Sequence, residues 1–344
     1  MTDRRVFYHG GGRIGKLRQM DEPRDSPPGE RDEVPPAPGT ACGPGFELAK
    51  LSPFEEWMQR IFIGRNGLRP IWRLVVYFLM YRALRFCLFV VLAYGLPDMP
   101  YLWRQIAAEL GLAIIVLPPA LLMARIEGRP FGVYGLPLRH AFGKLFWLGA
   151  LWGMAALTVL LAGLRGAHAF YFGTLALHGG RLLKFGLFWA VFFLIVGVYE
   201  EFFTRGYTQF TLTEAVGFWP AAILLSLGFG VLHLENPGES WVGILGAILI
   251  GFFFCLTLRR TGSLWFALGF HASWDWGESY LYSVPDSGGL APGHLLHSSL
   301  QGPRWLTGGS VGPEGSVFLF VLLVLLWLVF DRVYPEVKYP PRTA

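Results

Sequence analysis

Eight long apolar segments constrain the fold of this chain more than any other feature. Each is near or above the roughly 17–25 residues that a helix needs to cross hydrocarbon. Only 15% of the 344 residues are charged, whereas soluble proteins carry about a quarter. The segments cover residues 71–96, 104–125, 142–164, 183–213, 218–235, 241–258, 263–282 and 316–333. The sequence therefore predicts an all-α polytopic membrane protein, a bundle of about eight transmembrane helices.

The rest of the chain divides around these segments. Residues 1–50 are rich in Pro, Gly and charges of both signs, and we expect a disordered cytoplasmic tail because such a segment buries little apolar surface. Residues 51–66 repeat apolar side chains at helical spacing, which predicts an amphipathic interfacial helix. Residues 67–335 would form the eight-span membrane domain, and residues 336–344 a C-terminal tail.

Loop charges predict the orientation. Arginines precede the first span and lie in the second and sixth connections, whereas the fifth connection holds Glu235 and Glu239. The third connection, with Arg165, Arg181 and Lys184, disagrees. By the positive-inside rule we expect both termini on the cytoplasmic side of a plasma (inner) membrane. No basic cluster stands apart from the spans, so we do not expect nucleic acid as a partner. The expected partner is the lipid bilayer.

Local features refine this plan. Pro118-Pro119 should kink the second segment. Arg82 and Arg85 in the first segment would either snorkel to the interface or face the bundle. The connection 283–315, rich in Gly, Pro and Ser, is either a lid over an opening or a slack loop. Small residues recur in the sixth segment, where they would let helices approach closely: Gly243, Gly246, Ala247 and Gly251.

Ionisable side chains interrupt the fourth segment at L-I-V-G-V-Y-E-E-F-F-T-R, which places Glu200, Glu201 and Arg205 in apolar surroundings. Ionisable groups at membrane depth are costly, so they usually face a bundle interior or a cavity. Glu201 and Arg205 are four residues apart and share a helical face, which predicts an ion pair. Neighbouring helical residues point about 100° apart, so Glu200 is left to face a cavity.

Two further segments could meet Glu200. Taken as one helix over residues 183–213, the fourth segment would end in a turn at residues 214–217. Glu200 lies about as far before that turn as His233 lies after it, roughly 25 Å in each case. His271 lies inside the seventh segment and shares a helical face with Asp275. The spacing permits convergence of the three segments.

A carboxylate with histidines supports hydrolysis. Glu200 and His233 could activate a water as general base, either directly or around a divalent metal such as zinc that lowers the water's pKa. Donors on the far side would stabilise an oxyanion at an amide carbon. Ser226, Cys87 and Cys255 have no evident base, so a side-chain nucleophile is a poorer fit.

The motifs Glu200-Glu201-x-x-x-Arg205, Phe229-x-x-x-His233 and His271-x-x-x-Asp275 resemble those of the CAAX protease and bacteriocin-processing family. That family includes the type II CAAX prenyl endopeptidases (Ras-converting enzymes), which cleave peptides within membranes. The resemblance is strongest over residues 180–282, the protease-like core.

The resemblance implies a role for each motif residue. Glu200 would activate the water with His233, while His271 and Asp275 would stabilise the oxyanion or, in a metal-centred mechanism, help to hold the ion with Glu200 and His233. Three residues would support these groups or contact substrate: Glu201, Arg205 and Phe229. The family has Asn or Asp at position 275. An ionised Asp275 cannot donate to an oxyanion, so it would be protonated, orient His271 or bind a metal.

The resemblance implies a membrane-embedded glutamate-dependent or metallo-endopeptidase. Its substrate would be a peptide or protein at the membrane, lipidated in the case of CAAX-box protein processing. The same buried groups fit two other functions, a non-enzymatic transporter or ion relay and an immunity-type or adaptor protein that binds a peptide without cutting it. No internal repeat of the kind common in transporters is evident.

Overall fold

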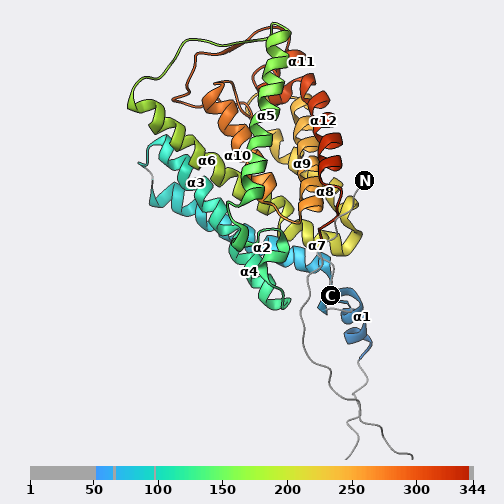
Figure 1. Ribbon diagram of the computed structural model, residues 1–344. Helices are drawn as coiled ribbons and strands as arrows, with labels where there is room; N and C mark the ends of the chain where they lie inside the picture. Colours follow the sequence, from blue (N-terminus) through green and yellow to red (C-terminus); the bar gives the residue numbers. More distant parts are fainter. Residues whose placement is uncertain (1–51, 65–66, 97, 341–344) are drawn as a thin grey trace, which may run out of the picture. The chain divides into compact units, whose positions relative to one another are not determined.

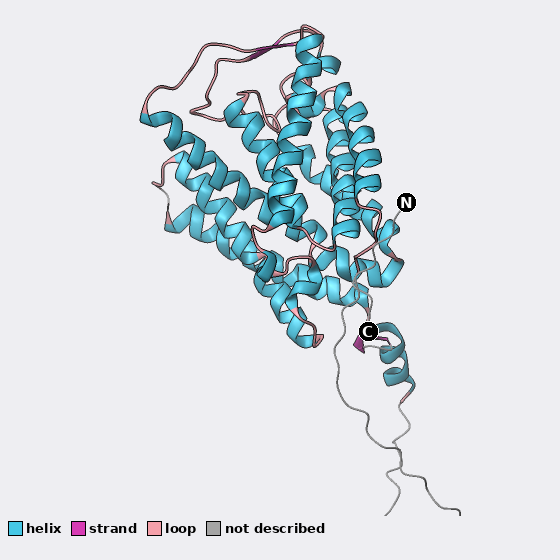
Figure 2. Ribbon diagram, in the orientation of Figure 1, coloured by secondary structure: helices cyan, strands magenta, loops and turns pink. Residues whose placement is uncertain are grey.

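The computed structural model describes residues 52–64, 67–96 and 98–340. The predicted tail over residues 1–50, and residues 341–344 of the C-terminal tail, lie outside the described residues. Among the described residues the fold is almost entirely helical (Figure 2), which confirms the predicted fold class.

The longer helices are α1 (Pro53–Phe62), α2 (Pro70–Val90), α3 (Tyr101–Ile115), α4 (Leu117–Ile126), α5 (Lys144–Gly166), α6 (Gly180–Arg205), α7 (Tyr207–Val216), α8 (Phe218–Leu232), α9 (Trp241–Thr261), α10 (Trp265–Trp276) and α12 (Val317–Val333). The shorter elements are η1 (Val91–Gly95), η2 (Phe131–Tyr134), η3 (Leu138–His140), η4 (His233–Glu235), η5 (Gly277–Leu281), α11 (Arg304–Thr307), η6 (Pro313–Gly315) and the strands β1 (Ile63–Gly64), β2 (Gly67–Leu68), β3 (Phe170–Tyr171) and β4 (Ser299–Leu300).

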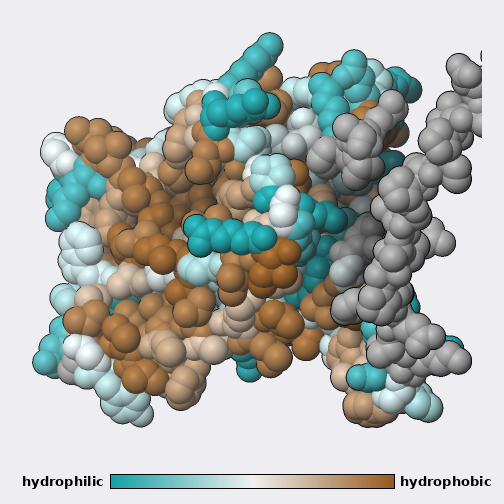
Figure 3. All heavy atoms as spheres, turned by 90° about the horizontal axis from the view of Figure 1, so that it is seen from below, coloured by the Kyte–Doolittle hydropathy of each residue, from teal (hydrophilic) through white to brown (hydrophobic). Residues whose placement is uncertain are grey.

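All eight predicted apolar segments are helical. Six helical stretches are long and apolar enough to cross a membrane, and they lie at 70–95, 101–126, 144–166, 180–216, 218–235 and 241–261. The stretch of α10 with η5, and α12, are shorter, so the count of eight spans stays a prediction. The helices carry many exposed large apolar side chains, and hydrophobic residues cover much of the face shown in Figure 3. Such surfaces suit contact with lipid.

The second and fourth apolar segments are each divided. The second breaks at Val116, between α3 and α4, directly before Pro118-Pro119, as the missing proline N–H groups predict. The fourth breaks at Gly206, where the backbone turns to φ −81° and ψ −117°. The prediction of one helix over residues 183–213 is therefore wrong. A Cβ at Gly206 would lie 2.4 Å from the Phe202 carbonyl oxygen, so only glycine fits this break.

Close packing of α5 against α10 fixes the helix that carries His271 and Asp275. These two helices run alongside one another with α9 and α12 (Figure 1). Three glycines line the contact. A Cβ at Gly149 would lie 2.0 Å from the Phe266 oxygen, one at Gly153 would lie 2.3 Å from the Phe270 oxygen, and one at Gly269 would lie 2.0 Å from the Phe146 oxygen. Because the two backbones are in direct contact, α10 has no room to shift along α5, and its position is fixed.

The connection between residues 283 and 315 is folded onto the bundle. Its strand β4 pairs with β3, which lies between α5 and α6 (Figure 2). Backbone hydrogen bonds run from Ala176 N to the Leu295 oxygen and from His297 N to the Thr174 oxygen, both 2.9 Å long. A slack loop would not make such bonds, so the structure favours a fixed covering layer over that alternative.

The described part of the C-terminal tail is also docked. The N–H groups of Lys338 and Tyr339 both bond the Arg259 carbonyl at the end of α9. The Tyr339 ring is 1% exposed and packs near Phe210 and Phe218. Residues 336–340 therefore belong to the folded body.

Candidate active site

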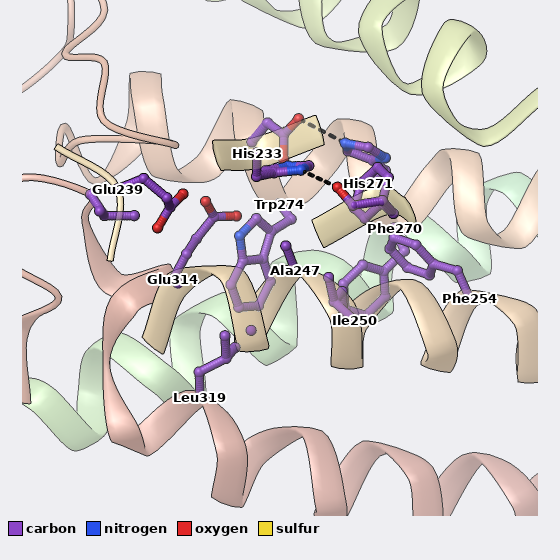
Figure 4. A pocket seen from close by; sticks show the side chains of 15 residues that line it. His233, Glu239, Ala247, Ile250, Phe254, Phe270, His271, Trp274, Glu314 and Leu319 are labelled. Atoms are coloured by element: carbon purple, nitrogen blue, oxygen red, sulfur yellow. Dashed lines mark hydrogen bonds and ion pairs between the residues drawn. The ribbon is translucent and has the colours of Figure 1, made fainter. Parts of the chain in front are cut away.

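The three predicted motifs converge. Glu200 lies on α6, His233 is the first residue after α8, and His271 lies on α10. The His271 Nε2 atom is 3.7 Å from Glu200 Oε2 and 3.3 Å from Asp275 Oδ2. Figure 4 shows His233 and His271 among the side chains that line a cavity. The convergence that helical spacing permits is therefore present in the fold.

Glu201 and Arg205 form the ion pair that their spacing predicts. Arg205 Nη1 donates to Glu201 Oε1 at 2.7 Å, and both side chains are buried, with 1% and 0% exposure. Arg205 Nε donates to the Gly251 carbonyl at 3.2 Å. The guanidinium lies over the Phe229 ring, 4.8 Å from its centroid. A charge this deep needs such a set of partners, and it links α6, α8 and α9.

The surroundings of this pair give new roles to Gly251 and Arg205, compared with those predicted from the sequence. Gly251, one of the predicted small residues of the sixth segment, makes room for the guanidinium, because a Cβ there would lie 2.7 Å from Arg205 Nη2. The suggestion that Arg205 contacts substrate does not fit, since the guanidinium has almost no exposed surface. In this arrangement Phe229 likewise supports Arg205 and His233 from a buried position.

His271 is held between carboxylates at both ring nitrogens. Its Nδ1 is 3.1 Å from Glu201 Oε1, and its Nε2 faces Asp275 and Glu200. An ionised carboxylate only accepts hydrogen bonds, so this arrangement suits an imidazolium that donates from both nitrogens. The ring also stacks on Phe254, with 5.9 Å between centroids. Asp275 therefore orients His271, one of the three roles considered for it.

His233 has one nitrogen occupied by the backbone. Its Nδ1 lies 2.8 Å from the Phe229 carbonyl oxygen. A carbonyl can only accept, so Nδ1 carries the hydrogen, and a neutral ring then leaves Nε2 with a free lone pair. The end of α8 at Leu232 places this ring at the helix terminus. His233 is thereby prepared to accept a hydrogen bond from water.

Two cavities meet at His233. An open groove of about 670 Å³ is lined by Glu200, His233, Arg82 and Arg85, among others. A smaller, more enclosed cavity of about 50 Å³ is lined by His233, His271 and Asp275. A water molecule needs roughly 10–15 Å³ of such accessible space, so the smaller cavity has room for a few waters. The Glu200 side chain, 29% exposed, reaches the groove, as the helical geometry predicts.

Sequence reasoning missed several acidic residues beside this site. Glu239 and Glu314 line the smaller cavity and lie to one side of the two histidines in Figure 4. Glu278 is fully buried and lies close to Asp286 and Glu314. Glu278 follows His271 and Asp275 at positions i+7 and i+3, so it shares their helical face, and this spacing could have found it.

The predicted catalytic metal would take its ligands from Glu200, His233, His271 and Asp275. Both nitrogens of His271 face carboxylates. In the part of the chain that the structure describes, the one set of three donor side chains whose ligand atoms lie within 4.8 Å of one another is Glu278, Asp286 and Glu314. It contains none of the four residues predicted to hold the ion, and metal binding by those four stays a prediction.

Comparison with known proteins adds an independent finding. Residues 181–277 match a family model described as type II CAAX prenyl endopeptidase Rce1-like. No curated protein matches the chain at a significant level. The matched segment runs from α6 through α10 and contains all three motifs. Together with the six apolar helices, the match indicates an integral multi-pass membrane protein. Over this segment, the chain is similar to the Rce1-like CAAX prenyl endopeptidases.

Proposed function

We propose that this protein is an intramembrane endopeptidase that hydrolyses a peptide bond with a water activated by Glu200. The observation that carries the proposal is the meeting of Glu200, His233 and His271 where an open groove adjoins a smaller cavity with room for a few waters. The match of residues 181–277 to a CAAX prenyl endopeptidase family model supports peptide hydrolysis as the reaction class.

The proposed mechanism begins with the water. The His233 Nε2 lone pair and the Glu200 carboxylate both accept hydrogen bonds, and they line the same groove. A water bonded to both has its oxygen lone pair free to attack the substrate carbonyl carbon. Glu200 takes one proton from this water as the bond to carbon forms, and it returns the proton to the leaving amine.

His271 supplies the positive charge in this mechanism. Its ring lies 3.7 Å from the Glu200 carboxylate and is held on both sides by Glu201 and Asp275. A fixed imidazolium near the attacked carbonyl stabilises the negative charge that develops on oxygen, because it needs little reorganisation in a low-dielectric site. Asp275 acts here through His271. No step requires a metal.

The groove also suggests how the peptide is oriented. Arg82 and Arg85 line it together with Glu200, so of the two positions predicted for these arginines, the one facing the bundle fits. A guanidinium pairs well with a carboxylate. We propose that they bind the carboxyl terminus of the substrate, the role that buried Arg205 cannot fill. Apolar residues Phe86 and Phe89 beside them suit a lipidated or hydrophobic segment.

The test is cleavage of a fluorogenic, lipidated peptide by the purified protein in detergent. Glu200→Gln and His233→Ala should each lower turnover by roughly 10²–10⁴-fold, the range for loss of a general base or its partner. Glu235→Gln is the matched control, because Glu235 lines the same groove and has no role in the proposed mechanism. It should keep wild-type turnover.

Equal turnover in wild type and Glu200→Gln would contradict the assignment. Proton or metal flux into liposomes without peptide cleavage would instead support the ion-relay alternative. Peptide binding that survives Glu200→Gln, with no cleavage by wild type, would support the adaptor alternative. Metal analysis of the active protein, with turnover measured before and after chelation, tests the predicted catalytic zinc.

A further inference from the structure

Three carboxylates gather beside the active site, where the 283–315 connection meets η5. They are Glu278 of η5, Asp286 of the connection and Glu314 of η6, and their ligand oxygens lie within 4.8 Å of one another. The three residues come from separate elements, so folding of the connection brings them together. The predicted chemistry of peptide hydrolysis does not use them.

Glu278 gives this cluster its significance. The side chain is 0% exposed, and neither carboxylate oxygen has a hydrogen-bond partner among the residues that the structure describes. The Trp274 indole N–H faces the carboxylate without reaching hydrogen-bond geometry. An ionised carboxylate that is buried without a partner lowers the stability of the fold by several kcal/mol, because it loses its hydration. A protonated carboxyl would also need an acceptor for its O–H, and the described part of the chain places none within hydrogen-bond distance.

In both Asp286 and Glu314, one carboxylate oxygen accepts a hydrogen bond from a serine hydroxyl. Ser279 Oγ donates to Asp286 Oδ2 at 2.9 Å, and Ser287 Oγ donates to Glu314 Oε2 at 2.9 Å. These bonds leave the second oxygen of each carboxylate for another partner. Burial raises the pKa of Asp286 well above its ordinary value, and the negative charges of Asp275 and Glu314 raise that pKa further. The carboxylates therefore repel one another as arranged.

The spacing fits a cation. Oxygen ligands bind Ca²⁺ at roughly 2.3–2.6 Å, so two oxygens on opposite sides of the ion lie about 5 Å apart. The backbone also comes close: Gly312 has φ +105°, and a Cβ there would lie 3.4 Å from Glu278 Oε1. A set of three carboxylates without His or Cys prefers hard cations such as Ca²⁺ or Mg²⁺ over zinc.

We propose that Glu278, Asp286 and Glu314 form a binding site for a divalent, oxygen-liganded cation of the calcium type. The ion would neutralise the buried Glu278 and tie the 283–315 connection to the end of α10. Asp275 lies one helical turn before Glu278, so the site fixes the wall of the cavity next to His271. The inference does not rest on the proposed peptidase activity.

The test uses the full-length protein in detergent, treated with chelator and then freed of it. Calcium titration by calorimetry should give one site, and calcium should raise the thermal midpoint because the ion binds only the folded state. Terbium bound at the site should show luminescence sensitised by the neighbouring Trp274. Glu278→Gln, Asp286→Asn and Glu314→Gln should each weaken calcium binding roughly tenfold or more, since each loses a charged ligand.

The controls separate this site from the active site and from general acidity. Glu239 lines the smaller cavity together with Glu314 but is not one of the three proposed ligands, and Glu239→Gln removes its charge. Glu200→Gln changes the proposed catalytic base. Both should bind calcium like wild type. Calcium-free Glu278→Gln should be at least as stable as calcium-free wild type, because it removes an unpaired buried charge, while losing the calcium-dependent rise.

Three outcomes would overturn the site. One is the absence of calcium, magnesium and terbium binding at neutral pH. Another is equal weakening in Glu239→Gln, which would mean that the cavity attracts cations only by its net charge. The third is an unchanged calcium response in the variants of all three proposed ligands. Loss of peptidase activity alone would bear on the proposed function and leave this inference standing.

Discussion

The carboxylate of Glu201 contacts His271: its Oε1 atom lies 3.1 Å from His271 Nδ1 and also accepts from Arg205. One buried oxygen thus joins the ion pair of α6 to His271 of α10, the proposed catalytic histidine. Glu201 therefore does more than compensate Arg205. It fixes the orientation of the ring whose other nitrogen faces Glu200 and Asp275.

This relationship predicts a large cost for removing Arg205. Arg205→Ala leaves Glu201 charged and buried, and breaking a buried pair in this way costs about 3–5 kcal/mol. Chemical unfolding in detergent should show this loss relative to wild type. Arg332→Ala, at an exposed arginine of α12, is the control and should change stability little. A loss in Arg205→Ala no greater than in Arg332→Ala would mean that the pair contributes nothing measurable.

The contact between α5 and α10 predicts strict dependence on glycine. Gly149→Ala and Gly269→Ala each place a methyl group 2.0 Å from a backbone oxygen of the facing helix. Each should destabilise the fold by about 1–3 kcal/mol or more, as overpacking does. Gly166→Ala, at the end of the same α5, meets nothing within 4 Å and should be neutral or stabilising. Thermal unfolding of the three variants checks this. Equal midpoints would contradict the close approach.

Tyr339 predicts a difference at alkaline pH. Burial raises its pKa well above the ordinary 10.0, and the neighbouring Tyr134 and Glu214 add to the rise. A raised folded-state pKa contributes stability that is present below the ordinary pKa and is lost as pH rises above it. Wild type should thus lose about 1.4 kcal/mol per pH unit above about 10 relative to Tyr339→Phe.

The measurement is the thermal midpoint of both proteins at about pH 8 and about pH 11. At the lower pH, Tyr339→Phe should match or exceed wild type, because the buried hydroxyl has no hydrogen-bond partner within residues 52–64, 67–96 and 98–340. The same pH dependence in both proteins would show that the C-terminal segment undocks before the phenol ionises.

The groove predicts recognition of a free carboxylate. Arg82→Gln and Arg85→Gln should each raise KM about tenfold for a peptide with a free carboxyl terminus, since a hydrogen bond to a charged group contributes about 1.5–3 kcal/mol. The matched substrate is the same peptide with an amidated end, for which the variants and wild type should have similar KM. A similar rise in KM for both peptides would indicate damage to the groove and not lost charge recognition.

The sequence by itself determined the class of fold and, for most motif residues, which of them share a helical face. Apolar length set the helices, Pro118-Pro119 set one break, and spacing of four residues predicted the Glu201–Arg205 pair. These properties are local, because helical periodicity and backbone chemistry act within one element. The resemblance to the CAAX proteases followed from the same motif residues, which the match over residues 181–277 contains.

Only the tertiary structure decided how the elements meet. The break at Gly206, the double contact of His271 and the burial of Arg205 each depend on an approach that no single segment specifies. The cluster of Glu278 with Asp286 and Glu314 depends on where a long connection folds back. Contacts between distant residues are set by the packing of whole helices, and the free energy of a buried charge depends on those contacts.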